Sequence, residues 1–185
     1  MKYLIGVVGE IGAGKGTFSA IISELAGKKT LKKIRFSDVL TKTLKLWDIP
    51  LTRANLQNLA IIMDQQYGKG TLTHAAKLYI NKQKADIVII EGIRWQSDVP
   101  MIRSFPNSFI IYMTADPKIR FERLKIRNEK VGESTKTYKE FLAEEKAGTE
   151  VEIKKIGKDA DFKFENNGDL GELKGKIKQF YKVLS

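Results

Sequence analysis

The sequence predicts an α/β fold built on a parallel sheet of five strands. Three apolar runs, at residues 3–8, 86–90 and 108–113, are continuous rather than alternating, as is typical of strands buried on both faces. Two weaker runs, at residues 31–36 and 161–164, are expected to complete the sheet. Segments with helical periodicity lie between the runs, and this alternation predicts parallel strands joined by right-handed crossovers.

The helical segments predict an insertion and a lid. A helix at about residues 17–25 follows the first strand, and helices are also expected at about 117–130 and 138–155. The stretch 39–84 is helical, with breaks near Pro50 and Gly68-Lys69-Gly70, and is long for one crossover, which favours a helical flap. The polar residues Gly132 to Thr137 are expected to form a mobile lid. The predicted organisation is one domain over residues 1–185, with a core at 1–38, 85–117 and 158–185, an insertion at about 39–84 and a lid region at about 118–157.

Composition narrows the possible chemistry. The chain of 185 residues has no cysteine, which excludes a disulfide scaffold, a thiolate zinc site and a cysteine nucleophile. The single histidine, His74, argues against a His-based catalytic triad. No apolar run approaches a membrane span, so we expect a cytoplasmic protein, as a monomer or small homo-oligomer. The net charge of +11 favours polyanionic partners and predicts weak, nonspecific nucleic-acid binding.

The strongest motif is a glycine-rich loop directly after the first strand. It reads Gly9-Glu10-Ile11-Gly12-Ala13-Gly14-Lys15-Gly16-Thr17. Glycines let the backbone turn tightly, so that successive N–H groups face one anion, and the helix that follows adds its positive end. Lys15 is placed to reach the outer phosphates of a nucleotide. We therefore expect an ATP-binding loop, with contacts from Gly9, Gly12, Ala13, Gly14, Lys15, Gly16 and Thr17.

This loop resembles that of adenylate kinase and its relatives, the nucleoside monophosphate kinase superfamily. The resemblance lies in the form Gly-Lys-Gly-Thr: Gly16 takes the position where the common pattern has Ser or Thr, and the hydroxyl comes one place later, at Thr17. It implies that Mg²⁺ is held largely through water. Thr17 and Glu91 are the candidate metal residues, with Glu91 at the end of the third strand acting as a Walker-B carboxylate.

Further segments occur in an order that resembles two branches of this superfamily. They are Phe36-Ser37-Asp38-Val39-Leu40, Glu91-Gly92-Ile93-Arg94, Arg120-Phe121-Glu122-Arg123-Leu124 with Arg127, and Ala160-Asp161-Phe162 leading to Asn166-Asn167-Gly168. Together they look like dephospho-CoA kinase-like proteins, including their archaeal relatives, and like phage-type deoxynucleoside monophosphate kinases. The resemblance implies a three-layer P-loop kinase fold with a parallel five-stranded sheet, a helical acceptor-binding flap and a small lid. It also places Asn167 and Gly168 beside the adenine ring.

Three arginines follow a helical stripe. Arg120, Arg123 and Arg127 have i, i+3, i+7 spacing in a chain that has only seven arginines among its 33 basic residues. A guanidinium grips phosphate oxygens with two parallel hydrogen bonds, which lysine cannot do. We therefore expect phosphate clamping, with Arg120 and Arg127 closing over the transferred group and Arg123 on the substrate. Arg94 is expected to bind an acceptor phosphate.

The acceptor determines the remaining expectations. A nucleoside monophosphate attacks with an anionic oxygen and needs arginines such as Arg53 and Arg94, with Gln57 beside them. Dephospho-CoA attacks through a hydroxyl, so a carboxylate such as Asp38 would act as general base, although a helix cap is the other interpretation of Asp38. Trp47 and Trp95 are expected to be packing anchors, with Trp95 beside the acceptor site.

The expected function is an ATP- and Mg²⁺-dependent small-molecule kinase acting on a nucleotide-type acceptor. Dephospho-CoA is the alternative acceptor, and transfer to a ribose hydroxyl of RNA is a third reaction. Two other classes stay open: a nucleic-acid-stimulated P-loop ATPase and a non-catalytic nucleotide sensor.

Overall fold

The sheet has five parallel strands, as predicted, and β1 lies at its centre. The computed structural model describes residues 3–127, 136–146 and 151–184. The sheet order is β2-β3-β1-β4-β5, and every neighbouring pair is parallel. The strands are β1 (Tyr3–Gly9), β2 (Leu31–Arg35), β3 (Ile87–Glu91), β4 (Ser108–Thr114) and β5 (Phe162–Glu165).

The strand register gathers the polar ends of three strands. Val7 of β1 is paired with Glu91, the last residue of β3, and Arg35, the last residue of β2, is paired with the same glutamate. Because the carboxyl ends of parallel strands meet at one edge, the loop after β1 lies beside the chain that leaves β2 and β3. Ligands bind at this edge in open α/β sheets.

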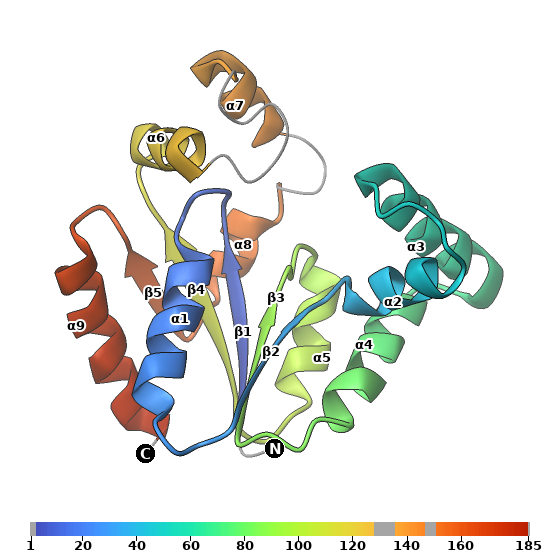
Figure 1. Ribbon diagram of the computed structural model, residues 1–185, viewed down its shortest axis with the longest axis horizontal. Coiled ribbons are helices and arrows are strands. Elements are labelled where there is room, and N and C mark those ends of the chain that lie inside the picture. Colours follow the sequence, from blue (N-terminus) through green and yellow to red (C-terminus); the bar gives the residue numbers. More distant parts are fainter. Residues whose placement is uncertain (1–2, 128–135, 147–150, 185) are drawn as a thin grey trace.

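Two apolar layers cover the sheet, which gives the three-layer arrangement that the sequence predicted (Figure 1). On one face, α1 (Lys15–Ala26) and α9 (Leu170–Tyr181) bury side chains such as Phe18 and Phe180. On the other face, α4 (Thr71–Asn81), α5 (Val99–Arg103) and α8 (Ile153–Lys158) contribute Ile80, Ile102 and Ile156. The three central strands, β1, β3 and β4, are apolar on both sides, so they read as continuous hydrophobic runs.

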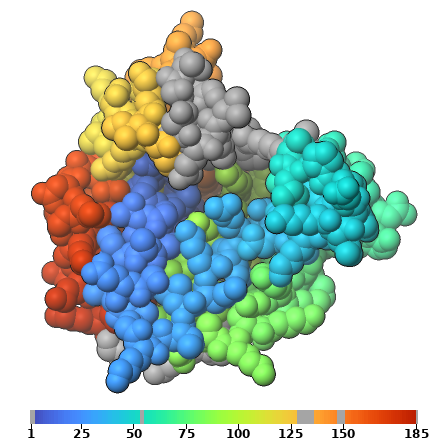
Figure 2. Space-filling view, in the orientation of Figure 1, coloured from blue at the N-terminus to red at the C-terminus, as the bar shows by residue number. Residues whose placement is uncertain are grey.

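The helical insertion follows β2, as predicted. It comprises α2 (Asp38–Leu46), α3 (Arg53–Tyr67) and α4, and the interruptions at Pro50 and Gly68 are confirmed. Leu40, Leu44 and Leu59 form a small apolar cluster of its own. In the space-filling view the insertion (cyan to green) lies at the right, and the residues coloured yellow and orange lie at the top left (Figure 2).

The lid region departs from the prediction in one respect. α6 (Pro117–Arg127) is close to the expected helix, but the single helix predicted for residues 138–155 is wrong. Residues 145–146 and 151–152 are turns that separate α7 (Tyr138–Glu144) from α8. The reason is that the two parts pack in different places: Phe141 packs against Phe121 of α6, whereas Ile153 packs against the sheet. Of the predicted lid segment, residues 132–135 lie outside the described residues.

Short elements complete the chain. A 3₁₀ turn, η1 (Gln96–Asp98), precedes α5, and η2 (Lys182–Leu184) follows α9. The expected turn at 166–168 lies between β5 and α9. Within the ranges that the structure describes, none of the helices combines the length and apolar character that crossing a bilayer requires.

Candidate nucleotide and acceptor site

The glycine-rich loop forms a turn that only small residues can make. Gly14 is the N-cap of α1 in the left-handed conformation (φ 100°, ψ 22°), and Gly12 also has a positive φ of 79°. A Cβ added to Gly14 would lie 2.4 Å from Nδ2 of Asn166, which donates a hydrogen bond of 3.0 Å to the carbonyl of Ala13. This hydrogen bond holds the loop in place. The amino end of α1, which directly follows the loop, is a favourable position for an anion.

A matched pair of glycine substitutions tests this geometry. Gly14→Ala is expected to lower the free energy of unfolding by at least about 1 kcal/mol, because the residue has positive φ and a close neighbour. Gly16→Ala is expected to raise it by about 0.5–1 kcal/mol, because Gly16 lies within α1 and an added Cβ meets nothing within 4 Å. Urea unfolding of both variants measures the difference. Equal effects would contradict the described loop conformation.

Lys15 lies folded over the loop and is desolvated. Its Nζ donates hydrogen bonds to the carbonyl oxygens of Gly9 (2.6 Å) and Glu10 (2.9 Å). Burial, followed by the nearby positive charge of Arg94, lowers the pKa of Lys15 to about 8, although Glu91 opposes the shift. The ammonium group would therefore gain from a polyanion that replaces the solvent it has lost.

Nucleotide binding should consequently depend on pH. A bound polyphosphate is expected to raise the pKa of Lys15 above about 8, its value in the ligand-free protein. The affinity should therefore be full below pH 8 and should fall as the pH rises through about 8 to 10. Binding near pH 8 should also take up protons. Isothermal titration of ADP in buffers of different ionisation enthalpy measures both effects. An affinity that stays constant from pH 7 to 10 would contradict this prediction.

One large cavity opens in front of Lys15. Its volume is about 1480 Å³, compared with about 300–1000 Å³ for typical small-molecule pockets. Segments from the phosphate loop, the ends of β2 and β3, the insertion, α5 and the end of α6 line it. Among the lining residues are Lys15, Arg35, Phe36, Asp64, Thr73, His74, Lys77, Glu91, Arg94, Trp95, Asp98, Met101 and Arg127. The geometry thus joins the predicted phosphate loop to the predicted flap.

The predicted lid arginines occupy three different environments. Arg127 lines the cavity. Arg120 does not line it and is almost completely buried: its Nε donates to the carbonyl of Ala115 (2.8 Å), and its Nη1 donates to the carbonyl of Ile11 (3.2 Å) and to Glu145. The expectation that Arg120 faces the transferred phosphate is not met in this arrangement, because its guanidinium braces the phosphate loop against the lid.

Arg123 lies next to the turn after β5. Its Nη1 donates to the carbonyl of Asn166 (2.8 Å), and burial lowers its pKa. The side chain of Asn167 accepts from the backbone N–H of Asp116 (2.7 Å), and Gly168 approaches the carboxylate of Glu172. These contacts hold the 166–168 turn beside the start of α6. Because none of these side chains lines the cavity, the substrate role of Arg123 and the adenine role of the turn stay predictions.

The predicted acceptor residues are only partly brought together. Arg94 lines the cavity, whereas Asp38 and Gln57 do not. Asp38 begins α2, and its Oδ2 accepts from the backbone N–H of Arg35 (2.8 Å), so its carboxylate closes the turn that enters the insertion. Gln57 is exposed on α3 because its helical position points away from the cluster formed around Leu59. Arg53 is the first residue of α3, and its side chain is outside the part of the structure that is described.

Comparison with known proteins assigns the family. The AAA_18 profile, an AAA domain, matches residues 5–148, from β1 past the lid helix α7. The chain belongs to this family. A UPF0200 protein of Methanococcus maripaludis is 28% identical over 98% of this chain and 97% of its own length. A UPF0200 protein of Methanocaldococcus jannaschii is 35% identical over 67% of this chain and 62% of its own length.

Solved structures show the same architecture. A shikimate kinase from Bacteroides thetaiotaomicron superposes with a TM-score of 0.62 at 14% identity, covering 98% of both chains. The protein TT1252 from Thermus thermophilus gives 0.60 at 18% identity, covering 100% of this chain and 98% of its own. At these identities the likeness concerns the fold alone. This AAA-domain protein thus has the three-layer P-loop kinase fold that the sequence predicted.

The two predicted metal residues of this AAA domain lie in different places. Glu91 lines the cavity, and its Oε1 accepts from the hydroxyl of Ser19 (2.6 Å) and pairs with Nζ of Lys33 (3.0 Å). Thr17 is exposed and does not line the cavity. Over the described ranges, no group of three acidic or histidine side chains could hold a metal. Glu91 therefore fits Mg²⁺ only together with phosphate oxygens and water, which is the mode that the resemblance to adenylate kinase relatives implies.

Several lining residues were not expected from the sequence. Asp98 is nearly completely buried, and Thr73 and Asp64 face the same cavity from the insertion. The two tryptophans differ from the prediction. Trp95 was expected to be a packing anchor, but it is 43% exposed and lines the cavity. The reason is that the segment after Glu91 leaves the sheet. Trp47 is also exposed (57%), so its predicted packing role is likewise wrong. In the sequence, the adjacent Arg94 and Trp95 after a strand end could have indicated that this segment lines a binding site.

Proposed function

We propose that the protein is an ATP-dependent phosphotransferase whose acceptor is a nucleotide-type anion, in the manner of a (deoxy)nucleoside monophosphate kinase. The observation that carries the proposal is the single cavity that contains Lys15 of the phosphate loop together with Arg94 and Arg127. These cations come from three separate parts of the chain. A donor triphosphate on the loop and an anionic acceptor beside it would both have positive partners there.

The chain's own residues supply position and charge. The amides of the loop and Lys15 would hold the β- and γ-phosphates, and Arg94 would orient the attacking oxygen of the acceptor. Arg127 would neutralise charge that develops on the transferred group. Glu91, through water, would hold Mg²⁺, which would supply positive charge beside the phosphates. Phosphoryl transfer requires little further chemistry from a protein, because an acceptor phosphate is already ionised.

The dephospho-CoA alternative makes a different demand. Its hydroxyl must lose a proton, so it needs a carboxylate in the cavity. Asp38, the expected base, is engaged with the backbone N–H of Arg35 and does not line the cavity, which favours the anionic acceptor. Asp64 and Asp98 do line it, so a hydroxyl acceptor would need one of these two.

The experiment is ATP consumption with Mg²⁺ against a panel of acceptors. The panel contains the ribo- and deoxynucleoside monophosphates, dephospho-CoA and a short RNA, and a reaction without acceptor is the blank. Turnover with a monophosphate is the expected result. Turnover with dephospho-CoA alone would replace the proposed acceptor. Turnover with RNA alone, ATP hydrolysis stimulated only by a polynucleotide, or nucleotide binding without any turnover would overturn the proposal.

A further inference from the structure

The segment that follows β3 is held by one buried carboxylate. Asp98 has only 3% of its surface exposed, and it lines the cavity. Its Oδ2 accepts from the backbone N–H of Trp95 (3.2 Å) and, more weakly, from that of Arg94 (3.5 Å). These bonds close the turn that carries both side chains, and they fix the direction in which each side chain leaves the backbone.

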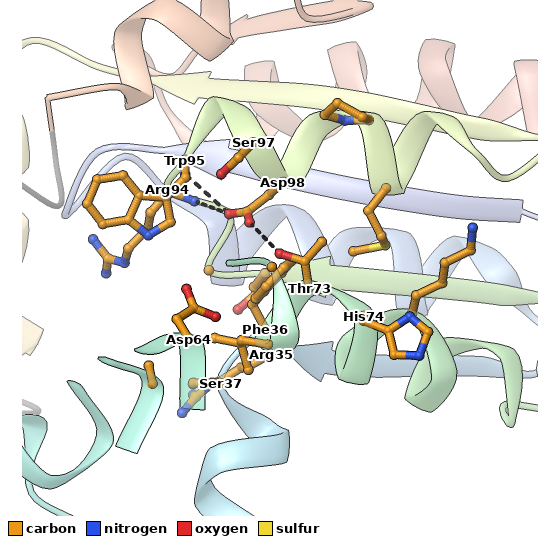
Figure 3. A pocket seen from close by; sticks show the side chains of 18 of the residues that line it. Arg35, Phe36, Ser37, Asp64, Thr73, His74, Arg94, Trp95, Ser97 and Asp98 are labelled. Carbon is orange, nitrogen blue, oxygen red and sulfur yellow. Dashed lines mark hydrogen bonds between the residues drawn. The ribbon is translucent and has the colours of Figure 1, made fainter. Parts of the chain in front are cut away.

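The same carboxylate also contacts the insertion. Its Oδ1 accepts from the hydroxyl of Thr73 (3.3 Å), which belongs to α4 (Figure 3). Figure 3 shows Asp98 between Thr73 on one side and the Arg94-Trp95 backbone on the other. One side chain therefore connects the flap to the loop at the acceptor end of the cavity.

Asp98 is balanced by hydrogen bonds rather than by a cation. Among the described residues, no lysine or arginine forms an ion pair with it, and burial raises its pKa. Glu152, which accepts from the N–H of Gln96 (2.6 Å), adds a second negative charge nearby. A buried carboxylate is stabilised by all of its hydrogen-bond donors together. The loss of one donor therefore weakens or shifts the hydrogen bonds to the others.

Trp95 and Arg94 present a combined surface to the cavity. Trp95 is 43% exposed and adjoins an arginine, and the apolar side chains of Phe36 and Met101 line the same cavity. An aromatic face stacks on planar rings, and a guanidinium binds anionic oxygens. The pair is thus suited to an acceptor that has a planar ring and an anionic group.

We propose that Asp98 and Thr73 are positioning residues of the acceptor site: Asp98 orients Arg94 and Trp95, and Thr73 couples their placement to helix α4. Trp95 is the platform on which the ring of the acceptor stacks. This inference rests on the proposed function, since it specifies how the acceptor of that reaction is selected. It assigns no proton transfer to Asp98.

The test uses Trp95 as its own reporter. The chain has two tryptophans, so the Trp47→Phe background leaves Trp95 as the single tryptophan, and excitation at the red edge of the absorption band avoids the tyrosines. In this background Thr73→Val removes the hydroxyl, Thr73→Ser restores it, and Thr71→Val is the matched control. The hydroxyl of Thr71 is also on α4 but bonds to the carbonyl of Gly68 (2.7 Å) instead of Asp98.

Two readouts are measured on each variant. For Thr73→Val we expect lower anisotropy of Trp95 without ligand, and a KM for the best monophosphate that rises about two- to tenfold, with kcat and the KM for ATP nearly unchanged. Thr73→Ser should restore both values, and Thr71→Val should change neither. Asp98→Asn should shift both readouts further. We also expect the best monophosphate to quench Trp95.

The outcomes separate this inference from the proposed function. If no acceptor is turned over, the proposed function fails, whereas the anisotropy of ligand-free Trp95 still tests the positioning role. Positioning is overturned if Thr73→Val and Asp98→Asn leave both the anisotropy and the acceptor KM at the parent values. A monophosphate that is turned over without changing Trp95 emission would overturn the stacking role.

Discussion

Replacing Lys15 with alanine is expected to lower the rate of phosphoryl transfer by about 10²–10³-fold. The ammonium group lies directly on the loop, with its Nζ at 2.6 Å from the carbonyl of Gly9, and alanine would remove this positive charge. The variant should fold, because burial disfavours the charged form of Lys15 and lowers its pKa to about 8. Removing this buried charge should therefore not destabilise the native state. Initial rates of ATP consumption and thermal unfolding measure the two effects.

The control for this substitution is Lys178→Ala. Lys178 is exposed in the last turn of α9, on the helix layer that packs against α1 rather than in the cavity, so its loss should leave the rate within about twofold. A Lys15→Ala variant with the activity of the parent protein would remove the central assignment. A variant that is inactive because it is unfolded would appear in the thermal melt.

Arg94→Lys is expected to lower kcat/KM for the acceptor by about 10- to 100-fold. The substitution keeps the positive charge in the cavity but removes the two parallel hydrogen bonds that a guanidinium gives to phosphate. The effect should fall on the acceptor, with the KM for ATP changed little, because the proposed function assigns the donor to Lys15 and the loop amides. Steady-state kinetics with each substrate varied in turn separate the two.

Arg103→Lys is the matched control for this substitution. Arg103 is on α5, bonds to Asp161 at 2.6 Å and does not line the cavity. Its replacement should leave the acceptor kinetics within about twofold. If Arg94→Lys and Arg103→Lys behave alike, Arg94 does not contact the acceptor.

The sequence was sufficient for the sheet and the phosphate loop, because local patterns determine both. Residues 86–90 read as a buried strand, and β3 indeed covers Ile87–Glu91 with four of its side chains buried. The loop was recognised because Gly14 and Lys15 lie between a strand and a helix, and the positive φ of Gly14 is what that motif requires. Pro50 and Gly68 likewise predicted the breaks between the helices of the insertion.

The cavity could be predicted only in part, since tertiary packing decides which side chains face it. Arg120 and Arg127 share a helical stripe, but only Arg127 lines the cavity, while Arg120 is buried under the loop. Asp38 follows a strand end as a catalytic carboxylate would, yet it bonds to Arg35 three residues earlier. Asp98 and Thr73 meet across 25 positions of sequence, and no local pattern indicates such a contact.

The central place of β1 affects how the chain can be made. Tyr3 pairs with Ile87, and Leu4 pairs with Ser108, so β1 leaves the ribosome before either of its partners, β3 and β4, has been synthesised. At about 5–20 residues per second this wait lasts roughly ten seconds. A strand as apolar as Leu-Ile-Gly-Val-Val is prone to aggregation during that time. Nascent chains that stop before β3 therefore lack both sheet partners of β1, those that stop before β4 lack one of them, and folding is governed by long-range pairing.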